Sequence, residues 1–261
     1  MTALVRLLAG LILLVTFWCT AAAATQWIHI PLPGTPRTPD GKPNLAAPPP
    51  RAADGRPDLS GIWSRSVGPS PSYLQNIARD LPGGAPLQPS AKALHDQRRA
   101  AEGAGRPSER CLPHGIPDAM MVGLPWKVIQ TPGVIIILFE EFNNWRQIFT
   151  DGRTHPVDPQ PSWFGYSVGR WDGDTFVAET TGFNDQTWLD DSGTPHTDAL
   201  RTVERFRRPS FGQLEIEFTF DDPKAFTRPW STTVKFDLRP DTELFDHHCE
   251  NEKWSSRSPV R

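Results

Sequence analysis

Short strand-like runs separated by tight-turn signals fill the second half of this chain. In residues 213–220 the apolar Leu214, Ile216 and Phe218 alternate with charged or polar residues, which is the pattern of a strand with one buried and one solvated face. The Asp-Gly-Asp sequence at 172–174 lies between two such runs and is typical of a hairpin turn. Nine strands are expected, over residues 128–130, 134–139, 145–150, 166–171, 175–181, 200–207, 213–220, 232–238 and 242–248. This spacing predicts a mainly β fold built from consecutive antiparallel hairpins.

These hairpins predict an antiparallel meander that closes into a lipocalin-like barrel of about 8–10 strands, because closure removes the exposed edge strands. A barrel of that size can enclose one small ligand. The sequence Gly61-Ile62-Trp63 at the head of the meander is similar to the G-x-W motif of lipocalin-like (calycin) barrels. A two-sheet sandwich is the alternative architecture.

Residues 61–261 are expected to form one domain, with an irregular or helical insertion at about 64–125. One short helix is predicted at 90–101, with Ser90 as its N-cap. A Pro-rich arm at 25–60 precedes the domain and contains a tandem, in which 37–45 and 51–59 share an Asp-Gly-basic-Pro sequence. Two copies are too few for a solenoid. We interpret the arm as a tether or a strap laid over the domain, with a role in binding an envelope partner as a further alternative.

The first 24 residues predict a secretory signal peptide. Arg6 precedes an apolar run at 7–18, and small residues at 20–24 provide a cleavage site. The apolar run is shorter than the roughly 20 residues that a membrane-spanning helix needs. We therefore expect a periplasmic or secreted protein with no membrane span after cleavage. The formal net charge of −3 provides no basic excess for binding nucleic acid.

Two cysteines, Cys111 and Cys249, remain after signal cleavage. An even pair in an oxidising compartment predicts a disulfide. A bridge that closes so long a loop stabilises the fold by about 5 kcal/mol at most in the chain-entropy treatment. A metal ligand or a catalytic thiolate is the alternative role for these cysteines, although no ligand spacing accompanies them.

Several longer motifs together resemble one family. These are PDGKPNL, DGRPDLSGIW, IFTDGRTHP, GYSVGRWDGDTFVAETTGFND and PHTDALRTVERFRR. Together they are similar to a family of secreted bacterial proteins of largely unassigned function. The resemblance covers most of the mature chain and implies export, and it carries no catalytic assignment.

Polar and aromatic residues concentrate between Arg146 and Phe206. We predict His155 and His196 as catalytic acid–base residues, because imidazole transfers protons near neutral pH and both lie in Pro-bounded loops. Asp151 and Glu179 are the carboxylates expected to orient them or to act themselves. In the alternative interpretation an Asp151–Arg153 pair closes the turn and His155 hydrogen-bonds to the backbone. For His196 the alternative is that Thr197 or Asp198 caps a short turn and the histidine has no role.

Arginines and aromatic residues of the same stretch predict the substrate-binding wall. Tyr166 and Arg170 share one face of a strand, and an arginine can bind an anionic group with two hydrogen bonds. The substrate-binding set is Arg153, Tyr166, Arg170, Trp163, Trp171, Trp188 and Asp185. Two structural alternatives remain open. Arg170 could fill the barrel and pair with Glu204, and Arg170 or Arg205 could close one barrel end over a tryptophan.

A zinc site built from His114, His155, His196 and either His247 or His248 is the metal-binding alternative, but no H-x-H or H-E-x-x-H spacing supports it, so no metal is expected. No P-loop, G-x-G-x-x-G or kinase motif is present, so no cofactor is expected. The sequence therefore predicts a periplasmic or secreted, cofactor-independent enzyme with a small-molecule partner. Its substrate is expected to be a small aromatic or apolar molecule with an anionic group, and its reaction to be of the lyase, decarboxylase, isomerase or hydrolase type. The alternative is a non-catalytic, lipocalin-like binding protein.

Overall fold

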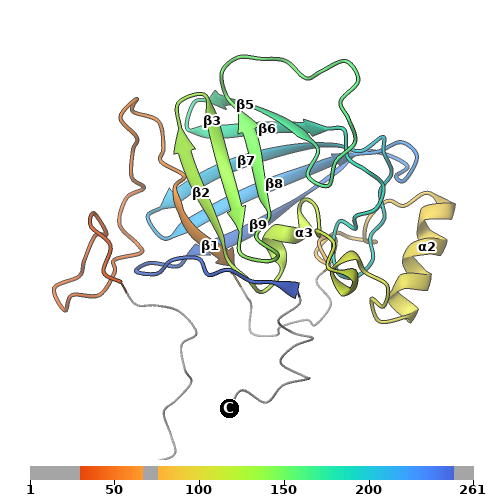
Figure 1. Cartoon of the computed structure of the whole chain (residues 1–261), viewed down its shortest axis with the longest axis horizontal. Helices are drawn as coiled ribbons and strands as arrows, with labels where there is room; N and C mark the ends of the chain where they lie inside the picture. The colour runs from red at the N-terminus through yellow and green to blue at the C-terminus, as the bar shows by residue number, and fades with distance from the viewer. Residues whose placement is uncertain (1–29, 67–75, 250–261) are drawn as a thin grey trace, which may run out of the picture.

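A computed structural model describes residues 30–66 and 76–249. The predicted signal peptide at 1–24 lies outside the described residues. Nine strands form a closed barrel in chain order (Figure 1), which confirms the predicted mainly β barrel. The strands are β1 (Gly61–Arg65), β2 (Trp126–Thr131), β3 (Val134–Phe139), β4 (Trp145–Phe149), β5 (Tyr166–Asp172), β6 (Thr175–Thr181), β7 (Arg201–Ser210), β8 (Gln213–Asp221) and β9 (Trp230–Leu238).

The strand that closes the barrel differs from the prediction. β1 pairs with both β2 and β9, and Trp63 is opposite Trp126 on one side and Leu238 on the other. The segment 242–248, predicted as the last strand, is not a strand. It is held instead by contacts such as the hydrogen bond from the Phe245 backbone N–H to Glu140 Oε2 at 3.0 Å. Because β1 already pairs with β9, no free edge remains for this segment to join.

The barrel is also not a pure antiparallel meander. β4 and β5 pair in parallel, with Ile148 opposite Ser167, while the other neighbouring strands are antiparallel. A parallel pair requires the connection to return along the barrel to the end where the first strand began. The 150–165 connection makes this return, so its residues lie along the barrel and not in a simple turn.

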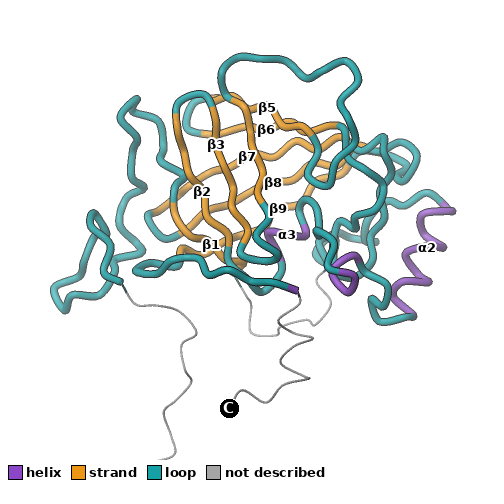
Figure 2. The backbone as a smooth tube through the Cα atoms, viewed as in Figure 1, coloured by secondary structure: helices purple, strands orange, loops and turns teal. Residues whose placement is uncertain are grey.

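The tight β2–β3, β5–β6 and β7–β8 turns lie at one end of the barrel, and the longer β1–β2, β6–β7 and β8–β9 connections lie at the opposite end (Figure 2). The three helices described belong to the connections at the end with the long loops: α2 (Pro89–Ala100), the 3-10 helix η1 (Pro107–Arg110) and α3 (Asp118–Met121). α2 confirms the predicted helix, but it begins at Pro89, and its N-cap residue Gln88 makes no side-chain cap. Ser90 lies inside the first turn, so the predicted Ser90 cap is wrong. No helix in the described ranges combines the length and the apolar character that crossing a bilayer requires.

Side chains fill the barrel interior in the layer around Arg146. The Arg146 guanidinium donates to both carboxylate oxygens of Glu204 at 2.8 Å, and it also donates to Ser167 and Thr180. The residues of the interior are almost completely buried and include Trp63, Trp126, Ile137, Phe176, Phe206, Phe218 and Phe236. The arginine that pairs with Glu204 inside the barrel is therefore Arg146 and not Arg170. Arg170 lies on the exposed face of β5, because adjacent strand residues face opposite sides.

An arginine over a tryptophan closes the end with the tight turns. The Arg208 guanidinium lies 4.8 Å from the ring centroid of Trp63. It donates to the backbone carbonyls of Asp58, Ser60 and Phe211. The predicted arginine–tryptophan closure is thus present, but Arg208 makes it in place of Arg170 or Arg205.

The two tandem copies of the arm form the same loop twice. Isolated bridges join Arg37 to Pro43 in the first copy and Arg51 to Pro57 in the second. Arg37 makes a two-point ion pair with Asp241, with contacts of 2.6 and 2.7 Å. Arg51 makes the same kind of pair with Asp174, with contacts of 3.0 and 2.8 Å. Both copies therefore hold the arm against the barrel, which fits the strap interpretation.

Candidate functional site

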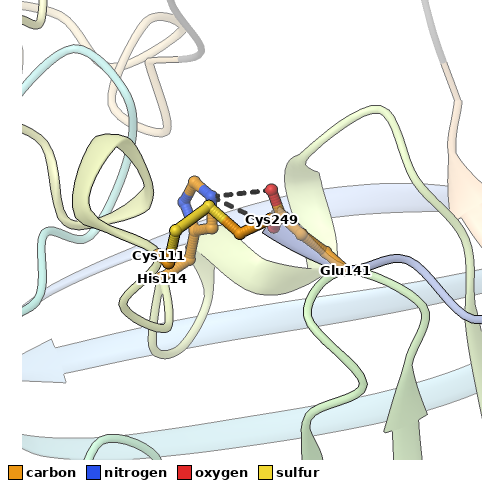
Figure 3. Close-up of a disulfide and its surroundings, with 4 residues drawn as sticks. All are labelled: Cys111, His114, Glu141 and Cys249. Atoms are coloured by element: carbon orange, nitrogen blue, oxygen red, sulfur yellow. Dashed lines mark hydrogen bonds and ion pairs between the residues drawn. A yellow bond between two sulfur atoms is a disulfide. The ribbon is translucent and has the colours of Figure 1, made fainter. Parts of the chain in front are cut away.

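Connections from four parts of the chain meet around His114 at the end with the long loops. They are the segment that carries η1 and α3, the β3–β4 turn, the β6–β7 loop and the segment after β9. Figure 3 shows His114 and Glu141 beside the Cys111–Cys249 disulfide. The disulfide confirms the predicted pairing and joins residues 138 apart in sequence. It fixes the loop that carries His114 to the chain next to His247.

His114 is buried and lies between two carboxylates. Its Nδ1 is 2.6 Å from Asp118 Oδ2, and its Nε2 is 3.0 Å from Glu141 Oε2. Asp118 opens α3, and the non-helical turn between His114 and Asp118 brings their side chains together. Gly115 allows this loop to approach the β6–β7 loop, because a Cβ at this position would lie 2.8 Å from Thr187. Any larger residue at 115 would collide with Thr187 and would be strained by the φ of +79°.

The carboxylates decide the protonation of His114. Burial by itself would lower the pKa of His114, but the charges and hydrogen bonds of Asp118 and Glu141 outweigh burial and raise it to about 11. Burial raises the pKa of Asp118 above its usual range, against the opposing charge of His114. Burial likewise raises the pKa of Asp191, against the opposing charges of His114 and Arg106. At neutral pH His114 is therefore an imidazolium that donates through both nitrogens.

A pocket of about 340 Å³ opens beside this cluster. Its lining includes His114, Glu141, Asp191, Arg106 and Phe142. Asp191 Oδ1 lies 3.7 Å from Arg106 Nη1. The pocket thus combines carboxylates that can transfer protons with a guanidinium that can bind an anion.

Phe142 forms an aromatic wall in this pocket, and its backbone adopts an unfavourable conformation there. Its ring is stacked on His114 at 6.5 Å and on His247 at 5.8 Å between centroids. Phe142 and Asn143 both have positive φ, at 56° and 53°. A bulky residue rarely adopts this left-handed conformation. This conformation places the ring between the two imidazoles.

His114, Asp118 and Asp191 each have a possible metal-ligand atom, and these atoms all lie within 4.8 Å of one another. The other oxygen of Asp118, Oδ1, is buried and has no hydrogen-bond partner among the described residues. The 2.6 Å distance between His114 Nδ1 and Asp118 Oδ2 is, however, that of a charge-assisted hydrogen bond. Two cis ligands of a small divalent cation would be farther apart, since each ligand lies about 2.1 Å from the ion. As arranged here, the pair shares a proton.

Most of the predicted site residues between 151 and 179 form a different cluster, on the outer wall of the barrel. Arg153 pairs with Asp151 at 2.6 Å and donates to the Tyr166 hydroxyl at 3.3 Å. His155 Nε2 lies 3.0 Å from the Glu179 carbonyl oxygen. Glu179 pairs with Arg170 and Arg201, and these arginines lower the pKa of its carboxyl group below the usual range although burial opposes them. The structure thus brings together Asp151, Arg153, His155, Tyr166, Arg170 and Glu179.

The other predicted residues lie elsewhere. His196 is buried in the β6–β7 loop, where it bonds to the Thr187 hydroxyl at 2.6 Å and the Thr197 carbonyl at 3.0 Å. Burial lowers the pKa of His196. No hydrogen bond or ring contact connects His196 with His155. The remaining aromatic and acidic residues are separate: Trp171 packs on Phe176, Trp163 is half-buried, and Trp188 and Asp185 line another groove.

Sequence reasoning missed Asp118, Glu141, Asp191 and Arg106. His114 and Asp118 lie only four residues apart in one connection, and this short separation was the local signal for the site. Glu141 and Asp191 join the site only through the fold. A comparison with models of known protein families, with curated proteins and with solved structures finds no match in any of the three. The observed architecture remains that of a closed nine-stranded barrel, which is consistent with a lipocalin-like barrel.

Proposed function

We propose that this chain is an exported enzyme that performs acid–base catalysis on a small, partly apolar molecule with an anionic group. The observation that carries the proposal is the buried His114, held between Asp118 and Glu141 at the wall of a pocket that also contains Asp191. Export rests on the signal-peptide pattern at 1–24 and on the disulfide, a bond that oxidising compartments favour. Membership in the secreted bacterial family rests on the motif resemblance and is part of this proposal.

Glu141 and Asp191 are the two proton-transferring groups in this proposal. Glu141 accepts a proton from the substrate, and the His114 imidazolium fixes its position through Nε2–H. Asp191, whose pKa burial raises, donates a proton to the product or leaving group. One proton enters and one leaves the enzyme in each cycle, and exchange with solvent resets both carboxyl groups. Eliminations, isomerisations and hydrolyses use such a pair. A decarboxylation uses the proton donor alone, because loss of CO2 leaves a carbanion that takes up one proton, which solvent then returns to Asp191.

Arg106 and Phe142 define the substrate class. Arg106 lies next to Asp191 at the pocket and can bind an anionic group. Phe142 presents an aromatic face between two imidazole rings, and a flat apolar substrate can pack against it. Asp118 does not line the pocket. It is a positioning residue, which acts by orienting His114.

The predicted pair of His155 and His196 is less well suited to this role. Both ring nitrogens of His196 are engaged, by Thr187 and by the Thr197 carbonyl. His155 bonds to a backbone carbonyl on the outer wall, as the structural alternative expects. A ligand carried inside the barrel, as in a lipocalin-like binding protein, would have to displace the packed layer around Arg146 and Glu204.

The test is product formation from a panel of small aromatic and aliphatic carboxylic acids and their esters, followed by mass spectrometry with the full chain. Glu141→Gln and Asp191→Asn should each lower turnover by at least about a hundredfold, the usual contribution of a general acid or base. Asp198→Asn is the matched control, because Asp198 is an exposed carboxylate that pairs with Lys224 on the surface. His155→Gln should retain turnover.

Full turnover in both pocket variants would refute the proposed site. A loss in His155→Gln alone would return the catalytic role to the outer-wall cluster. Saturable binding of a panel member without any product would show that the chain is a binding protein and not an enzyme for that compound.

A further inference from the structure

A second groove lies between α2 and the β6–β7 loop, and its volume is about 460 Å³. Its lining includes Leu94, Arg98 and Ala101 from α2 and its C-terminal end, and Trp188 from the facing loop. The segment 104–110 separates it from the His114 pocket, since Ala104, Gly105 and Arg110 line this groove while Arg106, Ser108 and Glu109 line the other. The two cavities are thus distinct sites at the same end of the barrel.

Arg98 is held rigidly in this groove. Its guanidinium lies 4.3 Å from the Trp188 ring centroid, and Nη1 donates to the Gly193 carbonyl at 3.2 Å. Its aliphatic stem packs on the backbone at Gly193, where an added Cβ would lie 2.5 Å from Arg98 Cβ. Gly193 also has a φ of +96°, which favours glycine. These contacts fix the guanidinium in one orientation without an acidic partner.

No carboxylate of residues 30–66 or 76–249 lies within ion-pair distance of Arg98. Arg146, by comparison, pairs with Glu204 inside the barrel. Burial lowers the pKa of Arg98 to about 10, and the charge of Asp190, which lies beyond ion-pair distance, opposes this shift only in part. Arg98 lines the groove, and none of its nitrogens is both enclosed and without a hydrogen-bond partner, so a nitrogen without a protein acceptor is exposed to solvent. An anion that enters the groove can therefore pair with a preorganised guanidinium.

The other groups of the groove define the ligand further. Arg110 adds a second positive charge and Asp185 one negative charge, so the groove carries one net positive charge and suits a monoanion. Leu94 is exposed and, with Ala101, provides an apolar surface for the body of a ligand. We propose that this groove binds a small aromatic monocarboxylate, whose carboxylate pairs with Arg98 and whose ring packs against Leu94, Ala101 and Trp188. This inference is independent of the catalytic role proposed for the His114 pocket.

The experiment is calorimetric titration of the full chain with benzoate, with benzamide as the uncharged isostere. Benzoate should bind saturably in the millimolar range or tighter, and at least about tenfold more tightly than benzamide. Arg98→Gln should weaken benzoate binding at least about tenfold. Arg99→Gln is the matched control, because it removes the same charge from the next, exposed residue of the same helix, and it should bind benzoate like the parent chain.

Arg98→Lys and Arg110→Gln keep the proposal testable if Arg98→Gln does not fold. Lysine retains the charge but lacks the planar two-point donor, so Arg98→Lys should also weaken benzoate binding. Arg110→Gln should weaken it less than Arg98→Lys. Unchanged affinity in a folded Arg98 variant, equal binding of benzamide, or no saturable benzoate binding would overturn the inference. Binding that Phe142→Ala abolishes and Arg98→Lys spares would assign benzoate to the His114 pocket, which overturns the second site and leaves the proposed function intact.

Discussion

Arg146 and Glu204 meet inside the barrel through two parallel N–H···O contacts, Nη1 with Oε2 and Nη2 with Oε1, each 2.8 Å long. Both side chains are almost completely buried. Replacing Glu204 with Ala leaves the Arg146 charge in the interior without its carboxylate. We expect Glu204→Ala to lower the free energy of unfolding by about 3–5 kcal/mol, as for other broken buried pairs.

The joint replacement Arg146→Met with Glu204→Leu should recover most of this loss, because it removes both charges and retains side-chain volume. Urea unfolding of the parent, the single variant and the double variant measures the difference. A single variant that unfolds at the parent's urea concentration would show that water reaches Arg146 and solvates it.

Two ion pairs hold the Pro-rich arm against the barrel, Arg37–Asp241 and Arg51–Asp174, and they should differ in how strongly they hold it. The carboxylate of Asp241 is buried and also accepts the Leu32 backbone N–H, whereas the Arg51–Asp174 pair is exposed on both sides. Exposed ion pairs contribute little because solvent screens them. Arg37→Ala should therefore increase the rate of proteolytic cleavage in the arm severalfold, and Arg51→Ala should leave it nearly unchanged. Limited proteolysis followed by mass spectrometry measures both rates, and equal acceleration in the two variants would contradict the distinction.

Local pattern explains which parts of the fold were predictable. The alternation in 213–220 reports burial directly, and β8 was predicted within one residue of its observed end. Which strands pair with each other cannot be read from the local sequence pattern. The sequence predicted residues 242–248 as the strand that follows β9, whereas in the closed barrel β9 pairs with Gly61–Arg65, from the far end of the domain. The parallel β4–β5 pair was missed for the same reason, because the 150–165 connection carries no signal for the direction of its return.

In the candidate site, too, the sequence predicted contacts within one segment but not contacts between distant segments. The Cys111–Cys249 pair was predictable because only two cysteines remain after residue 24. Asp151 and Arg153 were predicted to lie together because they flank one turn, and they do form an ion pair. Glu141 and Asp191 come from two different connections, and neither stands in a distinctive motif. Residues that converge only through tertiary structure leave no trace in a single sequence.

The disulfide should stabilise both the fold and the His114 pocket. The double variant Cys111→Ala with Cys249→Ala releases a connection between residues 138 apart, and we expect a loss of about 3–5 kcal/mol in the free energy of unfolding. The loss arises because the bridge restricts the unfolded chain. Guanidinium unfolding of the double variant, and of the parent protein in reductant, should give matching midpoints. A parent midpoint that reductant leaves unchanged would indicate that the bridge contributes little to stability.

The His114 cluster should make the fold less stable as pH rises. An unfolded histidine releases its proton near pH 6.5, whereas folded His114 retains it to a pKa of about 11. Between these values the folded chain binds more protons than the unfolded chain, so this contribution is complete below pH 6.5 and is lost as pH rises toward 11. Asp118 also makes the fold less stable as pH rises, but over a lower pH range, because burial raises its folded pKa above the unfolded value. The largest slope for one proton is about 1.4 kcal/mol per pH unit.

Urea unfolding at pH 7, 8 and 9 measures this slope in the parent, in His114→Gln and in His248→Gln. His114→Gln should flatten the dependence, because glutamine has no proton to release in this range. His248 is exposed, so its replacement removes a histidine without touching the cluster and should leave the slope unchanged. Equal slopes in the parent and in His114→Gln would mean that His114 is neutral in the folded state. The assignment of an imidazolium beside Glu141, on which the proposed catalytic roles rest, would then be wrong.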